Sequence, residues 1–411
     1  MGNKTKKMPA KPWAFAVLTL LLGLGSLLGG SNPAHAQSGI VVDNVRVGHI
    51  FGEEIRFRVQ VEAPDPIKHV FVLFRDIREE NTRVETMTLV DENFVYVYDA
   101  TQNILAPFAE LTIEFQVELE NGETFTSKRY AYTYSDDRFL WQSREEGNFR
   151  VHWNQGDETF GQAGLDAARN GFDRIQEFFP VNLDTPVDIY IYASPADLQN
   201  ALFMGGENWI AGHASPALGI VFVSIAPGPQ EKVLMQQQIP HELAHVMLYR
   251  YVGERYENLP TWLQEGIASL AELYPNADYA LALERAQTQG RLIPLTQLCA
   301  PFSRDASQAF LSYAEAASFT RYLRETYGVS QLDTLINTYA DGVNCESGAQ
   351  DVYGQSLQYL DARWQEAALG ANLYGVALRE TAPYLIILAI FLAYPALQYL
   401  LKRSKEGQRE Q

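Results

Sequence analysis

Residues 241–245, with the sequence HELAH, have the types and spacing of a metal site. On a helix, residues four apart share one face, so the imidazoles of His241 and His245 can bind a single ion. Zinc accepts histidine nitrogen at about 2.0–2.1 Å, which such a pair can provide. Glu242 lies beside the pair and can take a proton from a water at the metal. The alternative is a pair of histidines that only caps or packs a helix.

A catalytic zinc needs a third protein ligand, and the next motif offers one. The residues after His245 lack the Gly and third His of the metzincin pattern, but Glu265 follows in the segment 259–268, LPTWLQEGIA. Pro260 and Thr261 are typical of a helix start, which puts Glu265 one turn into a second helix. An acid in an otherwise apolar segment requires a partner. We expect the metal to be that partner, and a buried salt bridge is the alternative.

Together the two motifs resemble those of the gluzincin metallopeptidases. Nineteen residues separate His245 from Glu265, and the second motif has the form W-x-x-E-G-x-A, as in a group distantly related to thermolysin and aminopeptidase N. The resemblance covers about residues 138–375. It implies a zinc-dependent hydrolase that binds one Zn²⁺ per chain and cleaves peptide or protein substrates with a zinc-activated water. Carried over by position, it makes His241, His245 and Glu265 the zinc ligands and Glu242 the general base.

The same resemblance implies an oxyanion donor and a substrate-binding strand. Residues 311–319 resemble the segment in which aminopeptidase-like members place an oxyanion-stabilising tyrosine, here Tyr313, with simple packing as the alternative. Residues 209–214 resemble the edge strand that pairs with an extended peptide. From that strand we expect substrate contacts by Gly212, His213 and Ala214. A structural role for His213 is the alternative.

The chain departs from thermolysin after the third ligand. Thermolysin has an acidic residue one turn later that supports a metal-binding histidine, whereas this chain has Ser269 there and Glu272 further on. Such supporting groups tune metal affinity. The resemblance therefore leaves open which group supports the ligands here.

Strands followed by helices must position these motifs. Apolar periodicity predicts a helix over 164–179 and helices from residue 231 almost to the C-terminal apolar run. Pro240 either lies in the first turn of the HELAH helix or kinks a longer one. Strands are expected at 148–153, 187–192 and 217–225. This order predicts an α+β catalytic domain over residues 138–375.

The N-terminal part reads as β-structure. Alternating apolar and polar residues predict strands at 55–61, 70–74, 84–89, 94–98, 111–119 and 124–132, and Asn121-Gly122 is a strong hairpin signal. Residues 38–135 are therefore expected to form a β-sandwich of the immunoglobulin or fibronectin type III kind. The polar segment 135–146 marks the boundary with the catalytic domain.

Both ends of the chain carry apolar runs. Residues 1–36 have the basic, apolar and small-residue regions of a signal peptide, with an uncleaved anchor as the alternative. Residues 383–401 predict one transmembrane helix, followed by a basic cytoplasmic tail at 402–411. A buried core helix is the alternative for the second run. The expected protein is exported and held in the cell membrane by a single span, with its catalytic domain on the extracytoplasmic side.

The net charge bears on which partners the protein can bind, and the cysteine content bears on its crosslinking. The net charge of −18 becomes −22 when residues 1–36, with four Lys and no acid, are removed, and it argues against nucleic acid as a partner. Cys299 and Cys345, two cysteines in an exported chain, predict a disulfide, with two free thiols as the alternative. Two other functions compete with a peptidase. One is a non-catalytic surface adhesion or scaffold protein with a degenerate peptidase fold, and the other is a zinc hydrolase of a non-peptide substrate.

Overall fold

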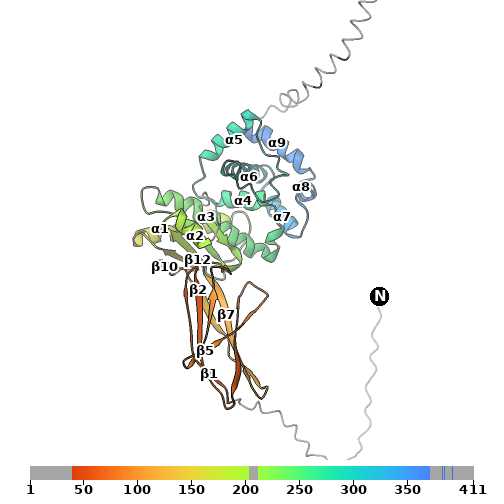
Figure 1. The fold of residues 1–411 in the computed structure, drawn as a ribbon. Helices are drawn as coiled ribbons and strands as arrows, with labels where there is room; N and C mark the ends of the chain where they lie inside the picture. Colours follow the sequence, from red (N-terminus) through yellow and green to blue (C-terminus); the bar gives the residue numbers. More distant parts are fainter. Residues whose placement is uncertain (1–38, 203–211, 371–381, 383, 385–390, 392–411) are drawn as a thin grey trace, which may run out of the picture.

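A computed structural model describes residues 39–202 and 212–370, together with Ala382, Tyr384 and Phe391 (Figure 1). The predicted signal peptide 1–36 and the tail 402–411 lie outside these residues, as does the predicted span 383–401 apart from Tyr384 and Phe391. Within the described part of the chain, no helix is long and apolar enough to cross a membrane. The β-sandwich lies at one end of the molecule, a bundle of helices at the other, and a mixed sheet between them (Figure 1).

The N-terminal region is all-β, as predicted, and consists of two antiparallel sheets. The first has the strand order β1 (Val41–Ile50), β2 (Glu54–Glu62), β6 (Asn93–Asp99), β5 (Thr88–Val90). The second has the order β4 (Arg83–Thr86), β3 (Ile67–Asp76), β7 (Ala109–Leu119), β8 (Thr124–Thr126), with β9 (Tyr130–Tyr134) also on β7. Alternate residues of facing strands are buried, and Phe57 of β2 contacts Phe74 of β3 with ring centroids 4.9 Å apart.

Two predicted strands are each divided into two. The segment 84–89 breaks at buried Met87, whose N–H donates to the Val70 carbonyl while the chain crosses from one sheet to the other. The segment 124–132 breaks at Ser127, which bonds to Phe115 through both its backbone and its hydroxyl. Strand β1 was not among the individually predicted segments. Assignment to the immunoglobulin or fibronectin kind stays a prediction.

The central sheet has three parallel strands and an antiparallel strand at each edge. Its order is β10 (Gln142–Glu146), β11 (Phe149–Trp153), β12 (Val187–Tyr192), β14 (Ile220–Ser224), β13 (Gly212–Ser215). Helices α1 (Glu158–Ile175) and α3 (Glu231–Val252) cover one face, and α2 (Pro195–Leu202) contacts β12 and β14. A short 3-10 turn, η1 (Pro216–Leu218), joins β13 to β14. The strand predicted at 217–225 therefore corresponds to β14, which begins later, at Ile220, because η1 occupies the start of the predicted range.

The remaining helices surround α6, which carries Tyr313 (Figure 1). They follow a 3-10 segment, η2 (Gly253–Asn258), and are α4 (Thr261–Ala271), α5 (Asp278–Gln289), α6 (Ala306–Tyr327), α7 (Val329–Ala340), α8 (Cys345–Tyr353) and α9 (Leu357–Leu369). Helices α4 and α6 meet at Gly266, where an added Cβ would lie 2.0 Å from Oγ1 of Thr320 and 2.7 Å from the Ala316 carbonyl. The glycine of the W-x-x-E-G-x-A motif thus allows α6 to pack directly on the helix that carries Glu265.

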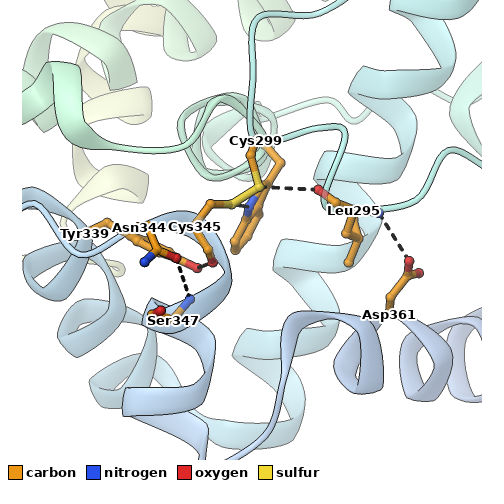
Figure 2. The surroundings of a disulfide bond; sticks show 8 residues. Leu295, Cys299, Tyr339, Asn344, Cys345, Ser347 and Asp361 are labelled. Carbon is orange, nitrogen blue, oxygen red and sulfur yellow. Dashed lines mark hydrogen bonds between the residues drawn. A yellow bond between two sulfur atoms is a disulfide. The ribbon is translucent and has the colours of Figure 1, made fainter.

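A disulfide joins Cys299 to Cys345, as the sequence predicts (Figure 2). Cys345 is the first residue of α8, and Cys299 lies in the segment between α5 and α6. Backbone N–H groups at the start of α4 donate to this segment, from Thr261 to the Cys299 carbonyl at 3.2 Å and from Trp262 to the Leu298 carbonyl at 3.0 Å. The crosslink therefore joins α8 to the segment whose carbonyls accept the first backbone N–H groups of α4.

Candidate metal centre and active site

Helix α3 carries the HELAH motif and contains Pro240 in its interior. Since proline has no N–H, it cannot bond to the Gln236 carbonyl one turn earlier. That carbonyl accepts a hydrogen bond from the N–H of Leu273 at 2.9 Å instead. Gly171 of α1 provides the space for the Pro240 ring, because a Cβ at position 171 would lie only 2.8 Å from Cβ of Pro240. Of the two positions predicted for Pro240, the structure has the one inside a longer helix.

The three predicted ligands meet at one point. Nε2 of His241 lies 3.3 Å, and Nε2 of His245 lies 3.6 Å, from Oε2 of Glu265. These are the only three His, Cys, Asp or Glu side chains in the described residues whose ligand atoms cluster in this way, all within 4.8 Å of one another. Two imidazoles and one carboxylate form a donor set that suits zinc with an open fourth position. The residues present therefore fit a catalytic zinc ion.

Each histidine is held by a second group at its other ring nitrogen. Nδ1 of His241 lies 3.1 Å from Oε1 of Glu272, and Nδ1 of His245 lies 2.9 Å from the Tyr256 hydroxyl. If both Nδ1 atoms carry the proton and donate it to these oxygens, both Nε2 lone pairs face Glu265. Glu272 thus occupies the supporting role that the sequence left open, and the bond from Leu273 to α3 holds it there.

Tyr256 was missed by the sequence analysis. It lies in η2, eleven residues after His245, with no motif around it. Burial, and then the charges of Glu265 and Glu242, raise the pKa of its phenol well above the ordinary value. The phenol therefore stays neutral and can accept the Nδ1–H of His245. No feature of the sequence separates this tyrosine from the other 21.

The charged groups of the site shift one another's pKa. Burial alone would lower the pKa of His241, but contacts with Glu265 and Glu272 outweigh it and raise that pKa well above the ordinary value. Burial alone would raise the pKa of Glu265, but the neighbouring His245 and His241 outweigh it, and that pKa falls to about 2. Glu265 is therefore an anion at neutral pH, as a metal ligand must be.

Glu242 lies beside the edge strand β13, and its pKa is raised, chiefly by burial. A raised pKa favours a carboxylate as a general base near neutral pH. A Cβ at Gly212 would lie 2.5 Å from Oε1 and 2.9 Å from Cγ of Glu242, so only glycine permits this approach. The expected contact of Gly212 with substrate stays a prediction, and what the structure shows is that Gly212 adjoins the Glu242 carboxylate.

The edge strand and Tyr313 line the same cleft as the metal centre. Gly212, His213 and Ala214 pair with β14, and no other described strand pairs with β13, which is the last strand in the sheet. The cleft has a volume of about 1810 Å³ and is also lined by His241, Glu242, His245, Glu265 and Tyr313. The Tyr313 ring lies 6.3 Å from the His241 ring and 5.2 Å from the Phe302 ring, centroid to centroid. The structure thus brings the predicted metal, catalytic and substrate-binding residues to one cleft, while residues 209–211 lie outside the described part.

One family of known proteins matches the half of the chain that carries this site. Residues 167–370, which include α3, α4 and α6, match the sequence model of the Peptidase MA superfamily. No curated protein sequence matches the chain at a significant level.

Solved structures give weaker similarities. An aminopeptidase N family protein from Idiomarina loihiensis is 8% identical with a TM-score of 0.38, over 80% of this chain and 75% of that one. Wild-type OgpA from Akkermansia muciniphila is 16% identical with a TM-score of 0.19, over 23% of this chain and only 28% of that one. A myokine structure is 13% identical with a TM-score of 0.19, over 23% of this chain and 95% of that one. Such low TM-scores carry no argument about fold. The family match by itself supports a gluzincin-type peptidase for the part of the chain that contains the candidate metal centre.

Proposed function

We propose that this protein is a zinc-dependent peptidase in which His241, His245 and Glu265 bind the ion. The observation that carries the proposal is the convergence of two histidine Nε2 atoms and one carboxylate from two separate helices, with Glu242 beside them. A buried salt bridge, the alternative considered for Glu265, would need only one histidine. Here both histidines face the same carboxylate, and each has its own support at Nδ1.

The bound zinc supplies Lewis acidity that polarises a carbonyl and lowers the pKa of water. Glu242 accepts a proton from the attacking water and returns it to the leaving amine, so the carboxylate ends the cycle ionised. β13 holds an extended substrate by backbone hydrogen bonds along its unpaired edge. Tyr313 donates its O–H to the oxyanion that develops as the carbonyl is attacked.

The test is a pair of variants in the full-length protein. Glu242→Gln keeps the side-chain shape but cannot take a proton, so we expect full zinc content and a fall in peptide hydrolysis of at least about 10²-fold. His241→Ala should lose most of the zinc because it removes a ligand. Tyr313→Phe removes one hydroxyl, and loss of an oxyanion donor typically costs about 10²–10³ in turnover. Wild-type rates in Glu242→Gln would refute the mechanism.

The competing functions predict different results in the same experiments. A scaffold with a degenerate fold would cleave nothing in a broad peptide library, and a non-peptide hydrolase would bind zinc stoichiometrically yet leave every peptide intact. Degenerate enzymes usually lose a ligand or the base. All four of the proposed ligand and base side chains are present here, which favours the peptidase.

We also propose that the protein is exported and anchored by the apolar run 383–401. The disulfide between Cys299 and Cys345 supports an oxidising compartment. A tag placed after Gln411 should be protected from protease added outside intact cells, while the catalytic part is accessible. Recovery of the mature chain in the soluble fraction without detergent would contradict the anchor.

A further inference from the structure

Three arginines line the active-site cleft of this acidic protein. They are Arg285 of α5, Arg291 just after α5, and Arg304 just before α6. Among the described lining residues the only carboxylates are Glu242, Glu265 and Glu272, and these belong to the metal centre. The whole chain has a net charge of −18. Beyond the metal centre, therefore, the described cleft wall has a charge opposite to that of the whole molecule.

Helix α5 places Arg285 along the wall of the cleft. Its cleft-lining residues Tyr279, Ala282, Ala286 and Gln289 recur at helical spacing, and Arg285 adjoins them. The start of α5 borders the same cleft as the proposed metal centre, because Tyr279 lines it together with Glu265 and Glu272. Arg285 comes six residues later, about 9 Å further along the helix axis. An extended peptide covers that distance in about three residues.

Arg285 and Arg291 are exposed, and neither forms an ion pair or side-chain hydrogen bond with any described residue. Guanidinium groups bind carboxylates in a fixed, often bidentate geometry. A cleft lined by one sign of charge also concentrates ligands of the opposite sign.

We propose that the cleft selects peptides with acidic side chains, and that Arg285 and Arg291 bind an Asp or Glu about two to three residues from the scissile bond. The inference rests on the proposed peptidase function and names its substrate class. It differs from the general binding of a peptide backbone by β13, which does not distinguish side chains. Arg304, just before α6, adds to the positive electrostatic potential of the cleft.

The experiment compares pairs of quenched fluorescent peptides that differ only by Glu or Gln at one position, two or three residues to either side of the cleaved bond. For the zinc-loaded full-length protein, kcat/KM should be about two- to tenfold higher for the Glu peptide at one or more of these positions. The advantage should shrink as NaCl is raised, because exposed charges are screened. In Arg285→Gln/Arg291→Gln the Glu-to-Gln ratio should fall toward one, and Arg285→Glu should favour a Lys peptide.

Arg321→Gln is the matched control. Arg321 is an exposed arginine of α6 that does not line the cleft, so the Glu-to-Gln ratio should stay at the wild-type value. A second readout does not depend on turnover. The Glu242→Gln variant should bind a labelled Glu peptide more tightly than its Gln partner in fluorescence anisotropy, and the double arginine substitution should remove that difference.

The outcomes separate this inference from the proposed function. Equal kcat/KM for Glu and Gln peptides at all tested positions would overturn the acidic preference and leave the peptidase proposal intact. A library in which no peptide is cleaved would count against the peptidase. In that case equal binding of the two peptides in the anisotropy measurement would overturn the acidic preference as well.

Discussion

At the scale of single residues, the proposed metal centre combines three candidate ligands with a second group that holds each imidazole. His241 is held by Glu272 and His245 by Tyr256, so both rings have one orientation before any ion binds. The two supports differ in charge. An anionic acceptor raises the basicity of the histidine it holds, whereas a neutral phenol mainly fixes the ring and its tautomer.

The first prediction is that the two supports contribute unequally to zinc affinity. Removing a supporting group typically weakens metal binding by about 10- to 100-fold. We expect Glu272→Gln to lie toward the upper end, since it removes a charge, and Tyr256→Phe toward the lower end. Competition with a chromogenic chelator measures both. Affinities equal to wild type in both variants would show that the ligands need no support.

A second residue-scale prediction concerns Glu315, which is fully buried in α6. Its carboxylate accepts the N–H of Ile293 at 2.9 Å, while Oε2 is buried with no hydrogen-bond partner. Burial raises the pKa of Glu315 to about 8, from an ordinary value of 4.5. The folded state therefore binds more protons than the unfolded state between these values. Stability from this group is fully present below about pH 4.5 and is lost as pH rises through 8.

Glu315→Gln removes the ionisation but keeps an acceptor for Ile293. At pH 5 the variant and wild type should have similar free energies of unfolding. At pH 8.5 the variant should be the more stable, by at most about 5 kcal/mol, the linkage value of a 3.5-unit shift. Urea denaturation at the two pH values measures this. A variant that is equally destabilised at both would show that Glu315 is ionised in the folded protein.

At the scale of elements, the edge strand β13 packs against helix α3, and Gly212 is the residue of the strand that adjoins Glu242. Gly212 leaves room for the Glu242 side chain, and any Cβ would displace it. The strand could therefore affect the proposed reaction in two ways. Its backbone borders the cleft where substrate would bind, and its Gly212 adjoins the proposed general base Glu242.

The third prediction follows from this contact. Gly212→Ala should shift Glu242 and lower kcat/KM by about 10- to 100-fold, since a misplacement of about 1 Å at a catalytic group can cost 10²-fold. Zinc content should not change, because the three atoms nearest to an added Cβ all belong to Glu242 and none to a proposed ligand. Gly48→Ala in β1 is the control: a Cβ there meets nothing within 4 Å. Unchanged activity in Gly212→Ala would mean that Glu242 has room to move without loss.

The features that could be predicted are those encoded by a motif within a single helix or strand. The HELAH spacing and the W-x-x-E-G-x-A motif located the metal centre because both are patterns within one helix. The edge strand that contains Gly212 was identified by resemblance, but its contact with Glu242 was not, since it joins elements far apart in the chain. Tyr256 was missed for the same reason, and so was the bond from Leu273 to Gln236 that makes use of Pro240.

At the scale of the whole molecule, one apolar cluster joins the β-sandwich to one face of the central sheet, while the other face packs in a second cluster with the helices. Phe108 stacks on Tyr190 of β12 with ring centroids 3.6 Å apart, and Phe222 of β14 lies in the same buried cluster. The polar segment expected as a boundary is partly buried here, where Asp136 accepts a hydrogen bond from the Tyr192 hydroxyl at 3.0 Å. Composition showed the polarity of residues 135–146, but it could not show that Asp136, Phe139 and Trp141 pack at this contact while Gln142–Glu146 stay exposed.

The disulfide acts at this largest scale, because it joins two parts of the helical bundle that are 46 residues apart (Figure 2). Closing a loop of this length restricts the unfolded chain and stabilises the folded one by about 4 kcal/mol in the chain-entropy model. Its position adds a local effect. The Cys299 and Leu298 carbonyls accept the first N–H groups of α4, and Trp262 donates its indole N–H to Sγ of Cys345 at 3.4 Å.

The last prediction compares Cys299→Ser/Cys345→Ser with wild type. A serine can still accept the Trp262 indole N–H, so the variant removes the crosslink while retaining that contact. Its free energy of unfolding, measured in urea without reductant, should be lower by about 2–4 kcal/mol. Zinc affinity should also weaken by a few-fold, because Glu265 lies one turn after the helix start that the crosslinked segment holds. Wild type treated with reductant under native conditions should reproduce both changes. If the variant and the oxidised wild type unfold at the same urea concentration, the crosslink contributes nothing and the packing around Trp262 alone holds α8 against α4.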